Sequence, residues 1–275
     1  MDTGSIFTNP WGNNVWGAIT GYYVDANGLC HGFLRNPNGA ITTFDPTGSI
    51  CTVAGNINDF GAIAGFYDDA SGVMHGFLLT PYGKMITFDA PGAGTGADQG
   101  TYPLLATCLN DFGAITGDYV DASNVYHGFV RAPDGSFTTI DVRGAQATFS
   151  NSINNEGAIS GYYVDAKGMN HGFVRAPDGT ITTFNVKGAG TGSGQGTMYS
   201  TNNQEGAIDG EYLDANNVWH GFVRAPDGTI TTFNIKGAGT GSGQGTTPAI
   251  INQEGAIDGS YVDEKNVSHG FLRLP

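Results

Sequence analysis

All six histidines of the chain lie in one recurring motif. Each histidine begins a His-Gly-Phe triplet and follows a Tyr-x-Asp triplet at constant spacing: His31, His75, His127, His171, His220 and His269. An imidazole near a carboxylate can act in general acid–base catalysis or bind a metal ion. Catalysis, however, needs one nucleophile or one substrate cleft rather than six copies. We therefore expect the motif to be structural, with no metal site and no cofactor.

The turn after each Tyr-x-Asp triplet predicts which side chains face each other. If Asp25 opens a type I turn and Gly28 takes the left-handed position, Tyr23 lies opposite His31. The same register, continued through the next turn, places His31 opposite Asp45. Because a neutral imidazole donates from one nitrogen and accepts at the other, we predict a buried hydrogen-bonded row that links phenol, imidazole and carboxylate or amide. The rows are Tyr23–His31–Asp45, Tyr67–His75–Asp89, Tyr119–His127–Asp141, Tyr163–His171–Asn185, Tyr212–His220–Asn234 and Tyr261–His269 with Asn9 as partner.

Glycines next to these rows indicate close packing. The glycine of each His-Gly-Phe triplet points to the opposite face, where we expect it to let the neighbouring repeat approach. Gly21 and its equivalents lie opposite Phe33 and its equivalents, which leaves room for the aromatic ring.

The elements that position these residues repeat along the whole chain. Successive histidines are 44, 52, 44, 49 and 49 residues apart, and each unit contains four short runs rich in Ile, Val, Thr, Tyr and Phe. Glycine-containing turns separate the runs, so each unit is predicted to be a four-stranded antiparallel meander. We predict an all-β protein that forms one six-bladed β-propeller domain of four-stranded blades, with a solenoid or two bodies of three blades as the alternatives. The expected blades are residues 11–46, 47–91, 92–143, 144–187, 188–236, and 237–275 completed by residues 1–10.

The sixth unit ends after its third run, at the sequence HGFLRLP. The N-terminal DTGSIFTNP resembles the fourth-run sequence DGTITTFN with one residue deleted, and this alignment would complete the last blade. Aligned without a gap, the same residues form the inner strand of the first blade. We prefer the first alignment, which gives blade one a short inner strand around residues 11–14.

Composition limits the partners. The chain has 275 residues, and its 25 acidic residues outnumber its 11 basic ones to give a net charge of −14. Such a surface repels nucleic acid and anionic membranes but leaves neutral glycans or cationic ligands possible. We recognise no signal peptide and no apolar run of membrane-spanning length. The oligomeric state is not indicated.

Three cysteines, Cys30, Cys51 and Cys108, do not form a metal-binding pattern. One bridge between two of them is possible, but we expect all three to be small buried side chains. The Gly-rich segments that begin at Gly92, Gly188 and Gly237 lack the lysine and the following helix of a phosphate-binding loop. We expect them to be flexible loops on one face, where binding residues commonly lie.

The pattern GxYxDxxxxxHGFxR, preceded by INxxGAI, resembles the HAF-type extracellular repeats of bacteria over essentially the whole chain. The family's His-Ala-Phe is His-Gly-Phe at all six places here. The resemblance implies a β protein that is extracellular or at the cell surface, and it supplies no catalytic residues.

Three functions are compatible with these patterns. The first is a non-catalytic binding or adhesion propeller, similar to a multivalent lectin. Its candidate contacts are aromatic residues beside the His-Gly-Phe strands and near the seam, because sugars stack on aromatic faces: Tyr126, Trp219, Trp11 and Trp16, with Met74 as a further position.

The second function is an enzyme that acts on a polysaccharide or lactone at the channel mouth. Its candidate catalytic residues are carboxylates at positions that vary between repeats: Asp209, Asp258, Glu211 and Asp118. The third is a structural surface protein that assembles with itself.

Overall fold

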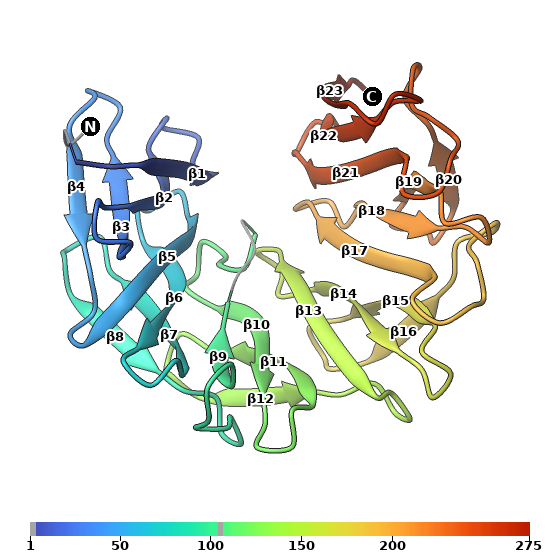
Figure 1. Ribbon diagram of the computed structural model, residues 1–275. Helices are drawn as coiled ribbons and strands as arrows, with labels where there is room; N and C mark the ends of the chain where they lie inside the picture. The colour runs from blue at the N-terminus through green and yellow to red at the C-terminus, as the bar shows by residue number, and fades with distance from the viewer. Residues whose placement is uncertain (1–3, 104–106) are drawn as a thin grey trace. The chain divides into compact units, whose positions relative to one another are not determined.

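A computed structural model describes residues 4–103 and 107–275 of the chain. All its regular structure is β-strand, so the described residues contain no helix that could cross a membrane. The chain divides into two compact units, residues 1–140 and 141–275, and each contains three of the six repeats. Within a repeat, consecutive strands pair antiparallel as meanders, as the sequence pattern predicts (Figure 1).

The first unit contains twelve strands. They are β1 (Phe7–Asn13), β2 (Ile19–Val24), β3 (Cys30–Arg35) and β4 (Ile41–Phe44); β5 (Ser49–Ile57), β6 (Ile63–Asp69), β7 (Met74–Leu79) and β8 (Met85–Phe88); and β9 (Gly100–Tyr102), β10 (Ile115–Val120), β11 (Tyr126–Arg131) and β12 (Phe137–Ile140).

The second unit contains eleven strands. They are β13 (Ala147–Ile153), β14 (Ile159–Val164), β15 (Asn170–Arg175) and β16 (Ile181–Phe184); β17 (Gly196–Asn202), β18 (Ile208–Leu213), β19 (Trp219–Arg224) and β20 (Ile230–Phe233); and β21 (Gly245–Ile251), β22 (Ile257–Val262) and β23 (Ser268–Arg273).

The strand register is the one that the turn chemistry predicts. Tyr23 pairs with His31, and Val24 pairs with Cys30, across β2 and β3. Gly28 has a φ of 84°, as the left-handed position of the turn requires. Asn124, Asn217 and Asn266 take that position with φ of 59–62°, which asparagine tolerates better than most residues.

The N-terminal alignment that we preferred is wrong. Residues Phe7–Asn13 form β1, which pairs antiparallel with β2 as the inner strand of the first repeat, so the ungapped alignment is the one observed. In that register Asn9 lies opposite Tyr22 on the inner strand of the first repeat, and not after a fourth strand, where the prediction places it.

Phenylalanine packing holds consecutive repeats together. The largest fully buried side chains include the phenylalanines of four His-Gly-Phe triplets: Phe77, Phe129, Phe173 and Phe222. The phenylalanine at the end of the fourth strand reaches the next repeat's triplet phenylalanine edge-on. The pairs are Phe44–Phe77, Phe88–Phe129, Phe184–Phe222 and Phe233–Phe271, with ring centroids 5.9–6.5 Å apart.

The triplet glycine makes this contact possible in a way that differs from our expectation. A Cβ on Gly32, Gly76, Gly172 or Gly221 would overlap the fourth-strand phenylalanine of its own repeat, not the backbone of the next. The phenylalanine lies over the glycine and projects from there to the neighbouring repeat. The glycine opposite the triplet phenylalanine does leave room for the ring, as at Gly161 beneath Phe173.

The backbones of consecutive repeats also touch. One residue pair forms a parallel bridge at each of four junctions: Cys30–Cys51, Met74–Gly100, Asn170–Gly196 and Trp219–Gly245. Our expectation of three reduced cysteines is wrong, because Cys30 and Cys51 form a disulfide at the first of these junctions. Their Cα atoms are 4.3 Å apart, which the strand pairing imposes. Cys108 is free and buried.

We predict that Gly172→Ala lowers the free energy of unfolding by about 1–3 kcal/mol, because the added methyl group displaces Phe184 from its contact with Phe222. Gly270→Ala is the matched control, since its Cβ would meet only the Gly259 carbonyl oxygen, at 4.0 Å. Denaturant unfolding of both variants measures the difference. Equal losses would contradict this account of the triplet glycine.

Candidate functional site

The turn between the first and second strands of each repeat is stacked on the same turn of the next repeat. The side-chain oxygen of Asn14 accepts hydrogen bonds from the backbone N–H groups of Trp16 and Ala18, which shapes the turn. Its amide nitrogen donates to the Asn58 carbonyl oxygen at 3.2 Å, and Asn58 donates to that of Asn110 at 3.0 Å. The turns of unit 1 are therefore held in a row.

A second set of bonds joins the same turns. The Val15 N–H donates to Asp59 at 3.1 Å, and the Asp59 N–H donates to Asp111 at 3.0 Å. In unit 2, Gln204 and Gln253 take the place of these aspartates, and the Gln204 N–H donates to Gln253 at 2.9 Å.

The next position of each turn in unit 1 carries an exposed aromatic side chain. Trp16, Phe60 and Phe112 are 70%, 70% and 67% exposed, and we call these three residues the aromatic turn row. The indole N–H of Trp16 donates to the Asp59 carbonyl oxygen at 2.9 Å, which orients its ring. The equivalent residues of unit 2 are Glu156, Glu205 and Glu254, which are exposed as well. Rigid, solvent-facing aromatic rings of this kind are suited to binding.

Only Trp16 of this row was among our sequence candidates. Phe60 and Phe112 were missed, although aligning the turns VWGA, DFGA and NEGA shows that the residue before the glycine is aromatic in three repeats and acidic in the others.

The other aromatic candidates are less accessible. Tyr126 and Trp219 begin β11 and β19 and are half-buried, and the backbone N–H of Trp219 donates across the junction to Gln244. The Tyr126 ring packs edge-on against Tyr102. Met74, also half-buried, occupies the same junction position on β7. Trp11 on β1 is half-buried beside Tyr22.

The predicted contact between histidine and the Asp or Asn after the fourth strand is confirmed in four repeats, and a second contact that we did not predict accompanies it. Nδ1 lies 2.7–2.8 Å from an oxygen of the residue after the fourth strand, in the pairs His31–Asp45, His75–Asp89, His171–Asn185 and His220–Asn234. Nε2 faces the turn aspartate of the Tyr-x-Asp triplet, at 3.1–3.8 Å. These pairs are His31–Asp25, His75–Asp69, His127–Asp121, His171–Asp165, His220–Asp214 and His269–Asp263.

The tyrosine of each row stacks on the imidazole instead of bonding to it. The six Tyr–His ring centroids are 4.8–5.1 Å apart. The hydroxyls of Tyr67 and Tyr212 hydrogen-bond Thr87 and Thr232 of the fourth strands instead. The predicted phenol–imidazole bond is therefore wrong, because the antiparallel pairing brings the two rings face to face.

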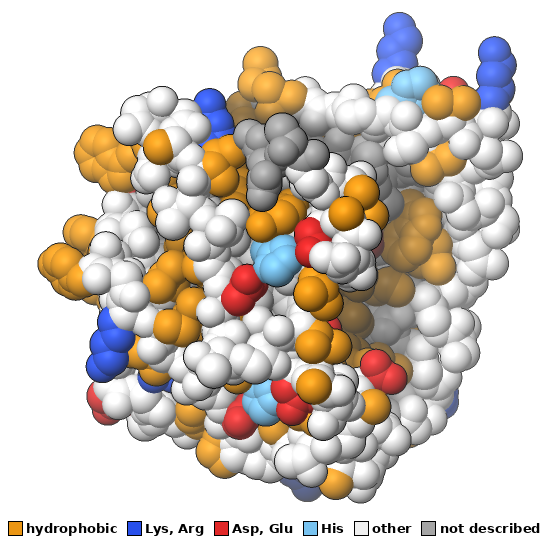
Figure 2. Space-filling view, turned by 60° about the vertical axis from the view of Figure 1, so that its left-hand side comes forward, with side chains coloured by type: hydrophobic (Ala, Val, Ile, Leu, Met, Phe, Trp, Pro, Cys, Tyr) orange, Lys and Arg blue, Asp and Glu red, His pale blue; other side chains and the backbone are white. Residues whose placement is uncertain are grey.

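The imidazoles are also only half-buried, and Figure 2 shows histidine side chains at the surface with acidic groups beside them. The two oxygens at a histidine bind opposite nitrogens of its ring and do not converge on one point. Within residues 4–103 and 107–275, no three His, Cys, Asp or Glu side chains are grouped to hold a metal ion. The pKa of Asp165 lies below its ordinary value, chiefly because the Met169 N–H donates to it and then because His171 does.

The Gly-rich segments are held by hydrogen bonds of one glutamine side chain each, Gln99, Gln195 or Gln244, and we call this arrangement the glutamine clamp. Our expectation of flexible loops is therefore wrong. The oxygen of Gln195 accepts from the Gly192 N–H at 3.0 Å, and its nitrogen donates at 2.9 Å to Asn217 in the turn between β18 and β19 of the same repeat. Gln99–Asn124 and Gln244–Asn266 repeat this bond. Asparagine takes the left-handed position of the turn in these three repeats, while Gly28, Gly72 and Gly168 take it where no such clamp is seen.

Two of the acidic candidates are buried together on β18. Asp209 and Glu211 are 1% and 8% exposed, and the Thr201 hydroxyl donates to Asp209, whose other carboxyl oxygen is buried without a partner. Burial raises the pKa of Asp209 to about 7 and, together with the charge of Asp209, that of Glu211 to about 8. Such burial keeps a substrate from both carboxyl groups.

Of the other two acidic candidates, Asp258 lies near enough for its charge to raise the pKa of Asp209 further. Asp258 is exposed on β22 in a shallow depression with Thr247 and Ser260. Asp118 is half-buried on β10, which belongs to the other unit.

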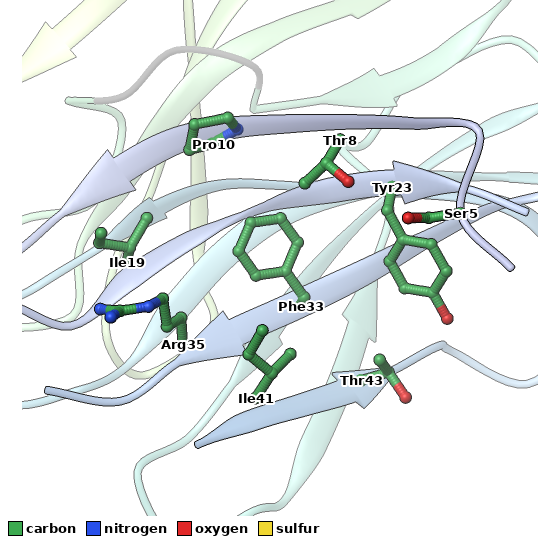
Figure 3. A pocket seen from close by; sticks show the side chains of 9 residues that line it. All are labelled: Ser5, Thr8, Pro10, Ile19, Tyr23, Phe33, Arg35, Ile41 and Thr43. Carbon is green, nitrogen blue, oxygen red and sulfur yellow. The ribbon is translucent and has the colours of Figure 1, made fainter. Parts of the chain in front are cut away.

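An apolar cavity of about 280 Å³ lies on the first repeat. It is lined by Phe33, Arg35, Ile19 and Ile41, with Tyr23, Thr8 and others at its margin (Figure 3). The equivalent residues of later repeats, such as Phe129 and Arg131, receive the fourth-strand phenylalanine of the repeat before them, here Phe88. This cavity is therefore the packing surface that consecutive repeats use.

Comparison with known proteins identifies the fold. No family model and no curated protein matches the sequence. Among solved structures, the chain is similar to puromycin hydrolase (TM-score 0.58, 10% identity), covering 98% of this chain but only 52% of the hydrolase, about half its length.

It is also similar to the BP39L lectin from Burkholderia pseudomallei (TM-score 0.53, 13% identity, 98% of this chain and 86% of the lectin). A third similar structure is AofleA from Arthrobotrys oligospora (TM-score 0.52, 12% identity, 96% and 81% coverage). At such identities the likeness shows the fold alone. The six meanders are the blades of a six-bladed β-propeller, as the repeat pattern predicts.

We predict that Asp209→Asn stabilises the protein increasingly as the pH rises from 4 to 8. The carboxyl group titrates near 3.8 when unfolded and near 7 when folded, so the folded state retains a proton that the unfolded state releases. The titration of Asp209 therefore lowers the free energy of unfolding of the parent protein by about 4 kcal/mol between these two pH values. Asparagine does not titrate and can still accept the Thr201 bond. Denaturant unfolding at several pH values tests this prediction. A difference in free energy of unfolding between the two proteins that stays constant with pH would contradict it.

Proposed function

We propose that the protein is a carbohydrate-binding β-propeller whose aromatic turn row provides the sugar-binding surface. The observation that carries the proposal is the exposure of Trp16, Phe60 and Phe112 on three consecutive turns that hydrogen bonds hold in place. Sugar rings present C–H faces that pack against aromatic rings, and a rigid row needs little ordering on binding.

The surrounding chemistry suits a neutral ligand. A net charge of −14 disfavours sulfated or otherwise anionic glycans, while backbone and side-chain polar groups of the turns supply donors and acceptors for hydroxyl groups. The three aromatic positions are equivalent, so the row favours several similar shallow contacts over one deep pocket. The shared fold with a protein named as a lectin supports the same class of function.

The location at the cell surface or outside the cell, which the HAF resemblance implies, belongs to this proposal. The Cys30–Cys51 disulfide supports it, because disulfides form and persist mainly in oxidising compartments.

A screen of neutral glycans against the folded protein is expected to give binding that quenches or shifts the fluorescence of Trp16. Trp16→Ala should then weaken the affinity about tenfold, because a stacked ring contributes on the order of 1.5 kcal/mol. Phe60→Ala and Phe112→Ala should have similar but smaller effects.

Tyr82→Ala is the matched control, because Tyr82 is 97% exposed but lies outside the aromatic turn row. Glu205→Ala probes the equivalent turn of unit 2 and should leave binding unchanged. Failure of every neutral glycan to bind, or full affinity in the triple variant without Trp16, Phe60 and Phe112, would refute the proposal.

A further inference from the structure

Two turns that carry the aromatic turn row also carry a carboxylate. Asp59 precedes Phe60 and Asp111 precedes Phe112, and both aspartates are half-buried. A carboxyl oxygen of Asp59 accepts the Val15 N–H of the preceding turn at 3.1 Å, and one of Asp111 accepts the Asp59 N–H at 3.0 Å. Each carboxylate therefore lies where two consecutive turns meet, beside the residues that bear the exposed rings.

The hydrogen bonds between turns do not require a negative charge. In unit 2 the acceptors are amides, because Gln204 accepts the Asn155 N–H at 2.6 Å and Gln253 accepts the Gln204 N–H at 2.9 Å. An uncharged side-chain oxygen is therefore sufficient to hold one turn against the next. The charge of Asp59 and Asp111 needs another explanation than the stacking of the turns.

The two units place charge and aromatic rings differently. In unit 2 an amide precedes an exposed glutamate, in the pairs Asn155–Glu156, Gln204–Glu205 and Gln253–Glu254. In unit 1 the carboxylate takes the place of the amide, and the aromatic ring takes the place of the glutamate. Negative charge thus lies beside the rings in unit 1, within reach of a ligand that stacks on them.

The carboxylate of Asp59 is not neutralised by a basic side chain. In the described ranges 4–103 and 107–275 it forms no ion pair with a lysine or arginine, and its bonded partner is the Val15 N–H. Unit 1 as a whole has three basic residues, Arg35, Lys84 and Arg131. A positively charged group of a ligand can therefore pair with this carboxylate.

We propose that the glycans that bind the aromatic turn row most tightly carry free amino groups, whose ammonium ions contact Asp59 and Asp111 while the sugar rings stack on the row. This inference rests on the proposed function and adds a preference for one class of sugar. A carboxylate attracts an ammonium ion, and so does the face of an aromatic ring. Stacking is available to neutral and amino sugars alike, so the charge distinguishes between them.

The probes are an oligomer of N-acetylglucosamine and the same oligomer after deacetylation, which share a backbone but differ in charge. Each is titrated into the full chain by calorimetry, at a pH at which the amino groups are protonated. We expect the deacetylated oligomer to bind about fivefold more tightly, as partly exposed ion pairs allow. Added salt should reduce this advantage, because it screens such charges.

The variants Asp59→Asn and Asp111→Asn separate the charge from the structural bond, since asparagine keeps an oxygen that accepts the N–H of the preceding turn. Each should reduce the advantage of the deacetylated oligomer about twofold and leave the affinity for the acetylated oligomer unchanged. Asp98→Asn is the control, because it removes the same charge from an exposed position between β8 and β9. It should leave the advantage intact.

Equal binding of the two oligomers would overturn the inference, and so would an advantage that persists in a folded double variant without both aspartates. The proposed function is judged separately. If the acetylated oligomer binds and Trp16→Ala weakens it, the sugar-binding surface stands even where the amino group has no effect. If neither oligomer binds, the preference for amino sugars is wrong, and the screen of neutral glycans alone decides the proposed function.

Discussion

The contact between one repeat's fourth-strand phenylalanine and the next repeat's triplet phenylalanine is the interaction on which the rest of the structure depends. A single four-stranded meander cannot bury both of its faces, so each repeat must cover its neighbour. The triplet glycine removes the side chain that would block Phe184, and the ring then reaches Phe222 edge-on. The guanidinium group of Arg224 lies 5.4 Å from the centre of the Phe184 ring, and equivalent arginines lie 4.8–4.9 Å from the fourth-strand phenylalanine at two other junctions.

The repeated residues are explained by this regular packing, so the deviations between repeats are the more informative features for function. The turns that stack on each other carry aromatic rings in unit 1 and glutamates in unit 2, although the hydrogen bonds that hold them are the same. Identical backbone geometry therefore presents two different surfaces. Asp209 and Glu211 occupy positions that hold small, hydroxyl or aromatic side chains in most other repeats, and their burial costs stability at neutral pH because the carboxyl groups are desolvated.

The histidine network shows how one motif can serve structure without buried acid–base chemistry. In four repeats the imidazole connects the turn after its own tyrosine to the end of the fourth strand, through opposite ring nitrogens, as His171 does. Asn185 and Asn234 substitute for aspartate with the same geometry, so the contact needs an oxygen acceptor and not a charge. The stacked tyrosine shields one face of the ring, which limits the conformations available to the histidine.

The sequence by itself determined the repeats, the four-stranded meanders, the strand register and the β-propeller fold. These follow from local rules, because Asn, Asp and Gly at fixed turn positions set the loop geometry and a side-chain period of two sets the faces. Trp16 was named as a candidate because it is an aromatic residue near the seam, and its place in a turn, which it shares with Phe60 and Phe112, was not used.

Only the tertiary structure decided which residues meet across repeats. The Cys30–Cys51 disulfide and the row formed by Trp16, Phe60 and Phe112 join neighbouring repeats, and no sequence pattern indicated either contact. Within one repeat, the stacking of tyrosine on histidine and the glutamine clamps were equally absent from the sequence pattern. Such contacts depend on how twisted sheets pack against each other, and no turn residue specifies that distance or angle. Exposure and burial of otherwise similar side chains, such as Phe60 and Phe77, follow from this packing alone.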